Sequence, residues 1–144
     1  PEVARGRKIA AKSIFKTGTQ LLARQMAPRL LSSGSQEQTS SLQPTVEKMI
    51  EQTSPDSIAA GQIAMSARTD ATSWLPMIDC PALFVGGEYD EITTTQEMSS
   101  NAALLPNAQF IEIKKAGHLT PLEQPESFND QVLGFLNSSQ FCQR

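Results

Sequence analysis

Histidine is almost absent from this 144-residue sequence, in which His118 is the single histidine. Zinc and non-haem iron sites need several convergent nitrogen, sulfur or carboxylate ligands, so the sequence gives such a site poor support. Glu88 and Glu91 stand beside Asp90, but a calcium or magnesium loop built from these oxygens has little more support. We therefore expect no bound metal.

Cysteine is also scarce, and Cys80 and Cys142 lie too far apart to form a metal-binding or redox spacing. Cys80 precedes a predicted strand, where a buried apolar residue or a free thiol is the ordinary interpretation. A disulfide between the two is not expected in a reducing compartment.

Long apolar runs are missing as well. No stretch approaches the roughly 20 residues that cross a membrane, and no signal-peptide pattern opens the chain. We expect a cytoplasmic location and no membrane partner. The hydrophobic content of 39% is sufficient for one core, in keeping with a single domain at this length.

Positive charge is concentrated at one end of the chain. Residues 1–30 carry seven Lys or Arg against Glu2 alone, which leaves the remainder strongly acidic. Arg5, Lys8, Lys12 and Lys16 recur at helical spacing and share one face. A solvated surface is the favoured interpretation, with attraction of a carboxylate-bearing substrate as an alternative. No aromatic residues interleave these charges, so we expect no nucleic-acid partner.

Periodic apolar residues predict helices in the first half of the chain. Gly18 separates the first predicted helix from the second. Pro28 is a kink or an early stop of the second helix, and Ser54 with Pro55 marks the start of the fourth. The Ser-rich stretch 32–41 is expected to be a loop. The predicted helices cover 3–16, 19–31, 44–53 and 55–68.

Two short apolar runs in the second half, 81–87 and 109–113, predict strands because they are rich in β-branched and aromatic residues and bounded by Pro, Gly or Asn. The connection reads as a helix over 94–105, opened by a capping box of Thr94 and Glu97. A crossover of this length predicts parallel strands.

Asp90 follows the first strand and His118 follows the second. Loops at the carboxyl ends of parallel strands gather at one edge of the sheet, so the two side chains can converge. A carboxylate bound to one imidazole nitrogen fixes the tautomer and leaves the other nitrogen as a base, which activates a nucleophile. A turn-forming Asp and a surface His are the structural alternatives.

The flanking segments have structural predictions. Trp74 and Leu75 are expected to anchor the chain ahead of the first strand, and Gly86 with Gly87 marks a tight strand end. A final amphipathic helix begins at Pro125. Glu123 lies close enough in sequence to touch the His118 loop but receives no catalytic role, and residues 137–144 read as a frayed tail.

Leu83 to Thr93 (LFVGGEYDEIT) and Ala116 to Phe128 (AGHLTPLEQPESF) together resemble the C-terminal end of the α/β-hydrolase fold, closest to cap-bearing bacterial esterases and enol-lactonase-like members. The resemblance implies an α/β fold in which two parallel strands with a crossover and C-terminal helices follow an all-helical cap. The cap corresponds to residues 1–69 and the hydrolase core to 70–144. Asp90 then resembles the family's acid and His118 its base, with no cofactor.

The cap of such an enzyme chooses the substrate, so its apolar side chains are candidates for a pocket wall. Ordinary packing between the helices is the favoured alternative, because methionine fills irregular gaps in any core. The candidates are Met26, Met49, Ile50, Ile63 and Met65.

The family's Gly-x-Ser-x-Gly turn is absent from the chain. The resemblance therefore implies a nucleophilic Ser on a missing N-terminal half and a small-molecule ester, lactone or similar acyl substrate. An Asp nucleophile, as in dehalogenases and epoxide hydrolases, and a non-catalytic ligand-binding or truncated protein are the alternatives. The chain alone is expected to be inactive, and its exposed strand edge to favour self-association or pairing with the missing half.

Overall fold

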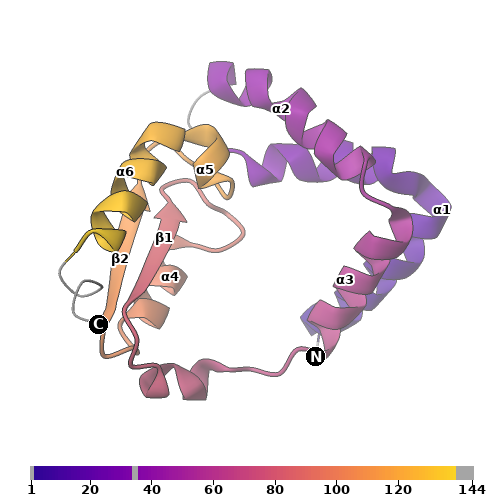
Figure 1. Cartoon of the computed structure of the whole chain (residues 1–144). Helices are drawn as coiled ribbons and strands as arrows, with labels where there is room; N and C mark the ends of the chain where they lie inside the picture. The colour runs from indigo at the N-terminus through magenta and orange to yellow at the C-terminus, as the bar shows by residue number, and fades with distance from the viewer. Residues whose placement is uncertain (1, 34–35, 139–144) are drawn as a thin grey trace. The chain divides into compact units, whose positions relative to one another are not determined.

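The computed structural model describes residues 2–33 and 36–138 (Figure 1). Two compact units are present. We name Pro1–Pro28 with Ser40–Asp70 the helical unit, and Arg29–Thr39 with Ala71–Arg144 the sheet unit. Residues 29–39, which the sequence analysis assigned to the helical region 1–69, therefore group with the sheet unit.

The helical unit contains α1 (Glu2–Leu30) up to Pro28, most of α2 (Gln36–Glu51) and α3 (Pro55–Ala67). The predicted break in the first helical segment is confirmed, because Gly18 has non-helical angles with φ 74° inside α1. The predicted start of α3 is confirmed as well: the Ser54 hydroxyl accepts a hydrogen bond from the Ser57 N–H at 3.1 Å.

The prediction of a loop over 32–41 is wrong from residue 36 onward, where α2 begins. Residues 34–35 of the predicted loop lie outside the described part. Helix propagation adds one hydrogen bond for each residue fixed, so α2, which contributes the buried Val46, can extend toward its N-terminus beyond the predicted start. An i,i+4 hydrogen bond from Gln43 Nε2 to Glu47 Oε1 at 2.8 Å supports the same helix.

Several apolar side chains of the helical unit are exposed. Met49, Ile63 and Met65 are 57%, 48% and 42% exposed, so the expectation that they pack between helices is wrong. Met26 and Ile50 are half-buried. The core of this unit instead uses small residues such as Ala23 and Ala27, which let helices approach closely.

The sheet unit holds β1 (Ala82–Gly87) and β2 (Ala108–Ile113), which pair in parallel from Ala82 with Ala108 to Gly87 with Ile113. The crossover is α4 (Thr95–Ala102), whose cap Thr94 accepts a hydrogen bond from the Glu97 N–H at 3.2 Å. The strand–helix–strand prediction is confirmed. Both arrows point the same way in Figure 1, toward the end of the sheet where α5 (Thr120–Glu123) lies.

Helices lie on both faces of the two strands. α4 contacts both strands, and α6 (Pro125–Leu136) contacts β2 on the other side (Figure 1). Residues of β1 and α6, together with Met98, line an open apolar groove of about 530 Å³. The lining includes residues of β1, α4 and α6 but none of β2, the one strand that pairs with β1 among the described residues, so we infer that the groove follows the unpaired edge of β1.

The segment ahead of β1 differs from its prediction. Trp74 lies in a short 3-10 helix, Thr72–Met77, and is 59% exposed, so the predicted anchoring by Trp74 is wrong. Such a helix has no amphipathic repeat that a sequence pattern would reveal. Cys80 is an exposed free thiol rather than a buried residue. Cys142 and residues 139–144 of the predicted tail lie outside the described part.

Within the described ranges, no helix combines the length with the apolar content that crossing a membrane requires.

Candidate functional site

Asp90 lies in a tight turn directly after β1. Its N–H donates to the Gly87 carbonyl at 3.1 Å, which closes the turn. Its Oδ1 accepts from the N–H groups of Ile92 at 2.8 Å and Thr93 at 3.0 Å. These bonds hold the carboxylate in one orientation and direct Oδ2 away from its own turn.

The predicted convergence of the two strand-end loops is confirmed. Asp90 Oδ2 lies 2.9 Å from His118 Nδ1. The Asp90 side chain is 6% exposed and the His118 ring 36% exposed, so a shielded carboxylate meets an accessible imidazole. A neutral imidazole that donates its Nδ1 proton to Asp90 keeps a lone pair on Nε2, which is the nitrogen that can accept a proton.

The backbone on both sides of His118 is bound by the end of α1. The Leu30 carbonyl accepts hydrogen bonds from the N–H groups of His118 at 3.1 Å and of Leu119 at 3.3 Å. The main chain that carries the imidazole is therefore held by a segment almost ninety residues earlier.

Glu123 binds the same loop from the other side. Its Oε1 accepts from the Gly117 N–H at 2.8 Å, and its Oε2 accepts from the Ser32 N–H at 2.6 Å. The residue is only 4% exposed. The sequence placed Glu123 near the His118 loop but missed the segment from Leu30 to Ser32, because no periodicity or motif reports a contact between positions so far apart.

Two glycines make this close assembly possible. A Cβ on Gly87 would lie 2.1 Å from the Gly117 carbonyl oxygen, and a Cβ on Gly117 would lie 2.6 Å from the Ser32 nitrogen. The predicted tight strand end at Gly87 is confirmed. The end of β1, the His118 loop and the chain after α1 meet where a side chain would not fit.

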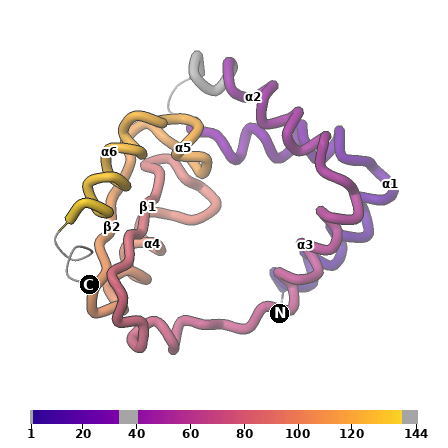
Figure 2. The backbone as a smooth tube through the Cα atoms, viewed as in Figure 1, coloured from indigo at the N-terminus to yellow at the C-terminus, as the bar shows by residue number. Residues whose placement is uncertain are grey.

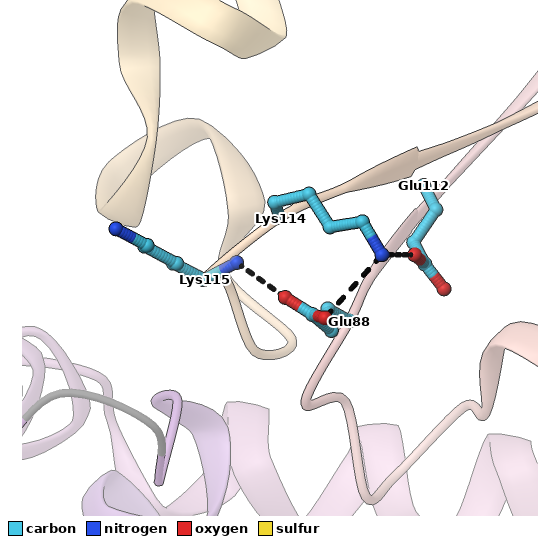
Figure 3. A network of polar contacts seen from close by, with 4 residues as sticks. All are labelled: Glu88, Glu112, Lys114 and Lys115. Carbon is cyan, nitrogen blue, oxygen red and sulfur yellow. Dashed lines mark hydrogen bonds and ion pairs between the residues drawn. The ribbon is translucent and has the colours of Figure 1, made fainter.

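A network of polar contacts joins the ends of the two strands (Figure 3). Glu88, at the end of β1, accepts from the Lys115 N–H at 3.0 Å and from Lys114 Nζ at 3.3 Å. Lys114 Nζ also contacts Glu112 Oε1. Lys115, in the turn after β2, has a positive φ of 57°.

These contacts shift two pKa values in the network. The Lys115 N–H, with help from Lys114, lowers the pKa of Glu88 below its ordinary 4.5. Hydrogen bonds from Lys114 to Glu112 and then to Glu88 raise the pKa of Lys114 above its ordinary 10.5. Glu88 is thus engaged with lysine groups on the neighbouring strand end. Across the residues that the structure describes, no three acidic, His or Cys side chains gather as metal ligands.

The arrangement has the chemistry of a general base. Asp90 can orient His118 and stabilise the imidazolium that forms when Nε2 takes a proton. Such a pair activates a hydroxyl nucleophile placed within hydrogen-bond distance of Nε2.

Comparisons with known proteins show the family and the fold of the chain. Residues 3–125 match the family model described as alpha/beta hydrolase fold. A thermophilic esterase from Thermogutta terrifontis superposes on 94% of this chain with a TM-score of 0.90 and 32% identity. An enol-lactonase from Burkholderia xenovorans covers 94% of this chain with a TM-score of 0.81 and 25% identity.

The carboxylesterase YbfK of Bacillus subtilis is 41% identical over 63 residues, which are 43% of this chain and 21% of the carboxylesterase. The match covers 50% of each of the two solved structures. The chain thus spans about half the length of those structures and about a fifth of that curated relative.

Proposed function

The chain belongs to the α/β-hydrolase family, and from this membership we propose that it supplies the base and the orienting acid of a serine-type hydrolase. His118 is the general base and acid, and Asp90 orients it. The nucleophilic Ser lies outside these 144 residues, since no Gly-x-Ser-x-Gly turn is present. The 2.9 Å contact between Asp90 Oδ2 and His118 Nδ1 is the observation that carries the proposal.

In the proposed reaction the Ser hydroxyl attacks the acyl carbon while His118 Nε2 takes the hydroxyl proton. The bond between the acyl carbon and the leaving oxygen then breaks, and the same proton passes to that oxygen. Water repeats the sequence on the acyl-enzyme, which frees the acid and restores Ser and His118. Asp90 stabilises the imidazolium in both halves of the cycle.

The substrate class follows from the relatives. The similar proteins described above are an esterase, an enol-lactonase and a carboxylesterase. A small-molecule ester or lactone is therefore the proposed substrate, and the same base chemistry serves both because a lactone is a cyclic ester. The helices of residues 1–69 are the proposed cap over that substrate, with their exposed Met49, Ile63 and Met65 as candidates for contact.

Pairing with the nucleophile-bearing half is part of the proposal. The apolar groove along the unpaired edge of β1 is lined by side chains that a further parallel strand and its helices would bury. We propose that the rest of the sheet continues from this edge. The 144-residue chain by itself then lacks turnover, because a base without a nucleophile has nothing to activate but water.

The test is turnover in the protein that includes the Ser-bearing segment. His118→Ala is expected to lower kcat for an ester at least a thousandfold. Gln131→Ala, an exposed position of α6 in the same unit, is the matched control and should leave kcat unchanged. Ester turnover of the His118→Ala protein within tenfold of the parent would overturn the proposal.

A further inference from the structure

Glu123 is a buried acidic side chain whose carboxylate reaches two separate segments of the chain. With 4% of its surface exposed, it accepts hydrogen bonds from the N–H groups of Gly117 at 2.8 Å and Ser32 at 2.6 Å. Burying a carboxyl group costs free energy unless its oxygens are hydrogen-bonded. An apolar residue would avoid that cost, so the position gains something from a carboxylate that packing alone does not provide.

We propose that Glu123 is a positioning residue for His118: it fixes the loop that carries the imidazole so that Nδ1 stays within hydrogen-bond distance of Asp90. The inference rests on the proposed function for its catalytic meaning. The spatial claim, that the carboxylate of Glu123 controls the orientation of the His118 ring, stands on the contacts themselves.

Three consecutive backbone N–H groups of the loop are bound. Gly117 donates to Glu123, and His118 and Leu119 both donate to the Leu30 carbonyl. Ser32, the second partner of Glu123, lies two residues after Leu30. Glu123 therefore binds both the His118 loop and the segment from Leu30 to Ser32 that holds this loop.

The Asp90 side of the pair is held independently. Asp90 Oδ1 is bound by the N–H groups of Ile92 and Thr93 within its own turn. A loss of the Glu123 contacts should therefore move His118 away from a fixed Asp90. Catalysis is sensitive to such displacement, because a misplacement of about 1 Å can cost on the order of a hundredfold in rate.

Glu123→Gln tests this with little change in volume. A carboxylate offers an acceptor oxygen to each N–H, whereas the amide of Gln offers one oxygen and turns its NH₂ group toward the other donor. One of the two contacts must break. Glu126→Gln is the matched control, since it makes the same change three residues later at an exposed position in the first turn of α6.

The first readout is the nitrogen-15 NMR spectrum of the imidazole in the 144-residue chain, where His118 is the single histidine. At a pH where the ring is neutral, the parent and Glu126→Gln should show the proton on Nδ1. Glu123→Gln should populate both neutral tautomers, because the ring is released from Asp90. A role in stability alone would lower the unfolding temperature and leave this spectrum unchanged below it.

The second readout is kinetic, in the protein that includes the Ser-bearing segment. Glu123→Gln is expected to lower kcat about 10- to 100-fold with KM nearly unchanged, while Glu126→Gln matches the parent. The inference would be overturned if Glu123→Gln kept the proton on Nδ1 as the parent does and also had the same kcat as the parent. If His118→Ala leaves turnover intact but Glu123→Gln still shifts the tautomer, the proposed function fails and the positioning contact stands.

Discussion

The backbone of Gly117 passes so close to Gly87 that a Cβ on Gly87 would lie 2.1 Å from the Gly117 carbonyl oxygen. The end of β1 is thus packed directly against the loop that presents His118. The same loop touches the chain after α1, where a Cβ on Gly117 would meet the Ser32 nitrogen at 2.6 Å. The position of the imidazole is a consequence of main chain packed on main chain, with no side chain between that could adjust.

Gly87→Ala should therefore be strongly destabilising. Overpacking of a well-packed site costs about 1–3 kcal/mol, and a backbone oxygen cannot turn aside as a flexible side chain would, so we expect the upper end of that range or more. The free energy of unfolding from urea denaturation measures the effect.

Gly134→Ala is the matched control in the same unit. Gly134 lies inside α6, and a Cβ there meets nothing within 4 Å. Alanine is the better helix former, so this change should stabilise by about 0.5–1 kcal/mol. Equal stability of the two variants would contradict the packing described for Gly87.

The network around Glu88 predicts that the free energy of unfolding depends on pH. The Lys115 N–H lowers the pKa of Glu88 below 4.5, so near that pH the folded state binds fewer protons than the unfolded state. The stabilising contribution of Glu88 is complete above about pH 4.5 and is lost as the pH falls through the lowered pKa. Glu88→Gln removes this contribution to the free energy of unfolding, so its effect on stability depends on the pH at which it is measured.

The difference in urea midpoint between the parent and Glu88→Gln should accordingly be largest near neutral pH and shrink on acidification below about pH 4.5. Glu91→Gln makes the same change at an exposed neighbour in the same loop and is the matched control. A difference that stays constant from neutral pH to about pH 3 would contradict the assignment of the lowered pKa to these contacts.

We proposed that the rest of the sheet continues from the open edge of β1, so this edge predicts how the 144-residue chain behaves alone. An unpaired strand bordered by an apolar groove is a surface on which chains associate. Size-exclusion chromatography with light scattering should show species larger than the 15.6 kDa monomer. A monomeric elution with a sharp unfolding transition would contradict this prediction.

Leu136→Lys places a charge in that groove and should reduce the association. Gln131→Lys adds the same charge to α6 at an exposed position outside the groove and serves as the control. An equal effect of both variants would mean that net charge, and not the groove, governs the oligomeric state.

The strand–helix–strand core was predictable because its signals are local. Gly87 and Pro106 mark boundaries, Thr94 caps the crossover helix, and the apolar runs are too short for helices. Parallel pairing then follows from the length of the crossover. The meeting of Asp90 with His118 required only the further rule that the carboxyl ends of parallel strands share one edge of the sheet.

What the sequence could not reveal depends on long-range contacts. The hydrogen bond from the Ser32 N–H to Glu123 joins positions 91 residues apart. Neither segment has a sequence pattern that predicts this contact. Burial posed a related difficulty. Trp74 is a large apolar residue of a type that is usually buried, but it is 59% exposed. Burial depends on which elements pack nearby, and the local sequence does not encode that.

The central claim, that Asp90 and His118 act as one catalytic unit, is tested most directly by a double-mutant cycle on kcat in the protein that includes the Ser-bearing segment. Asp90→Asn presents an amide to Nδ1 and favours the wrong tautomer, so it should lower kcat roughly 10³- to 10⁴-fold, as should His118→Ala. If the two residues form a unit, the double variant should be no more than about threefold slower than His118→Ala alone. A double variant whose loss equals the product of the two single losses, or an Asp90→Asn protein that retains kcat within tenfold of the parent, would contradict the account.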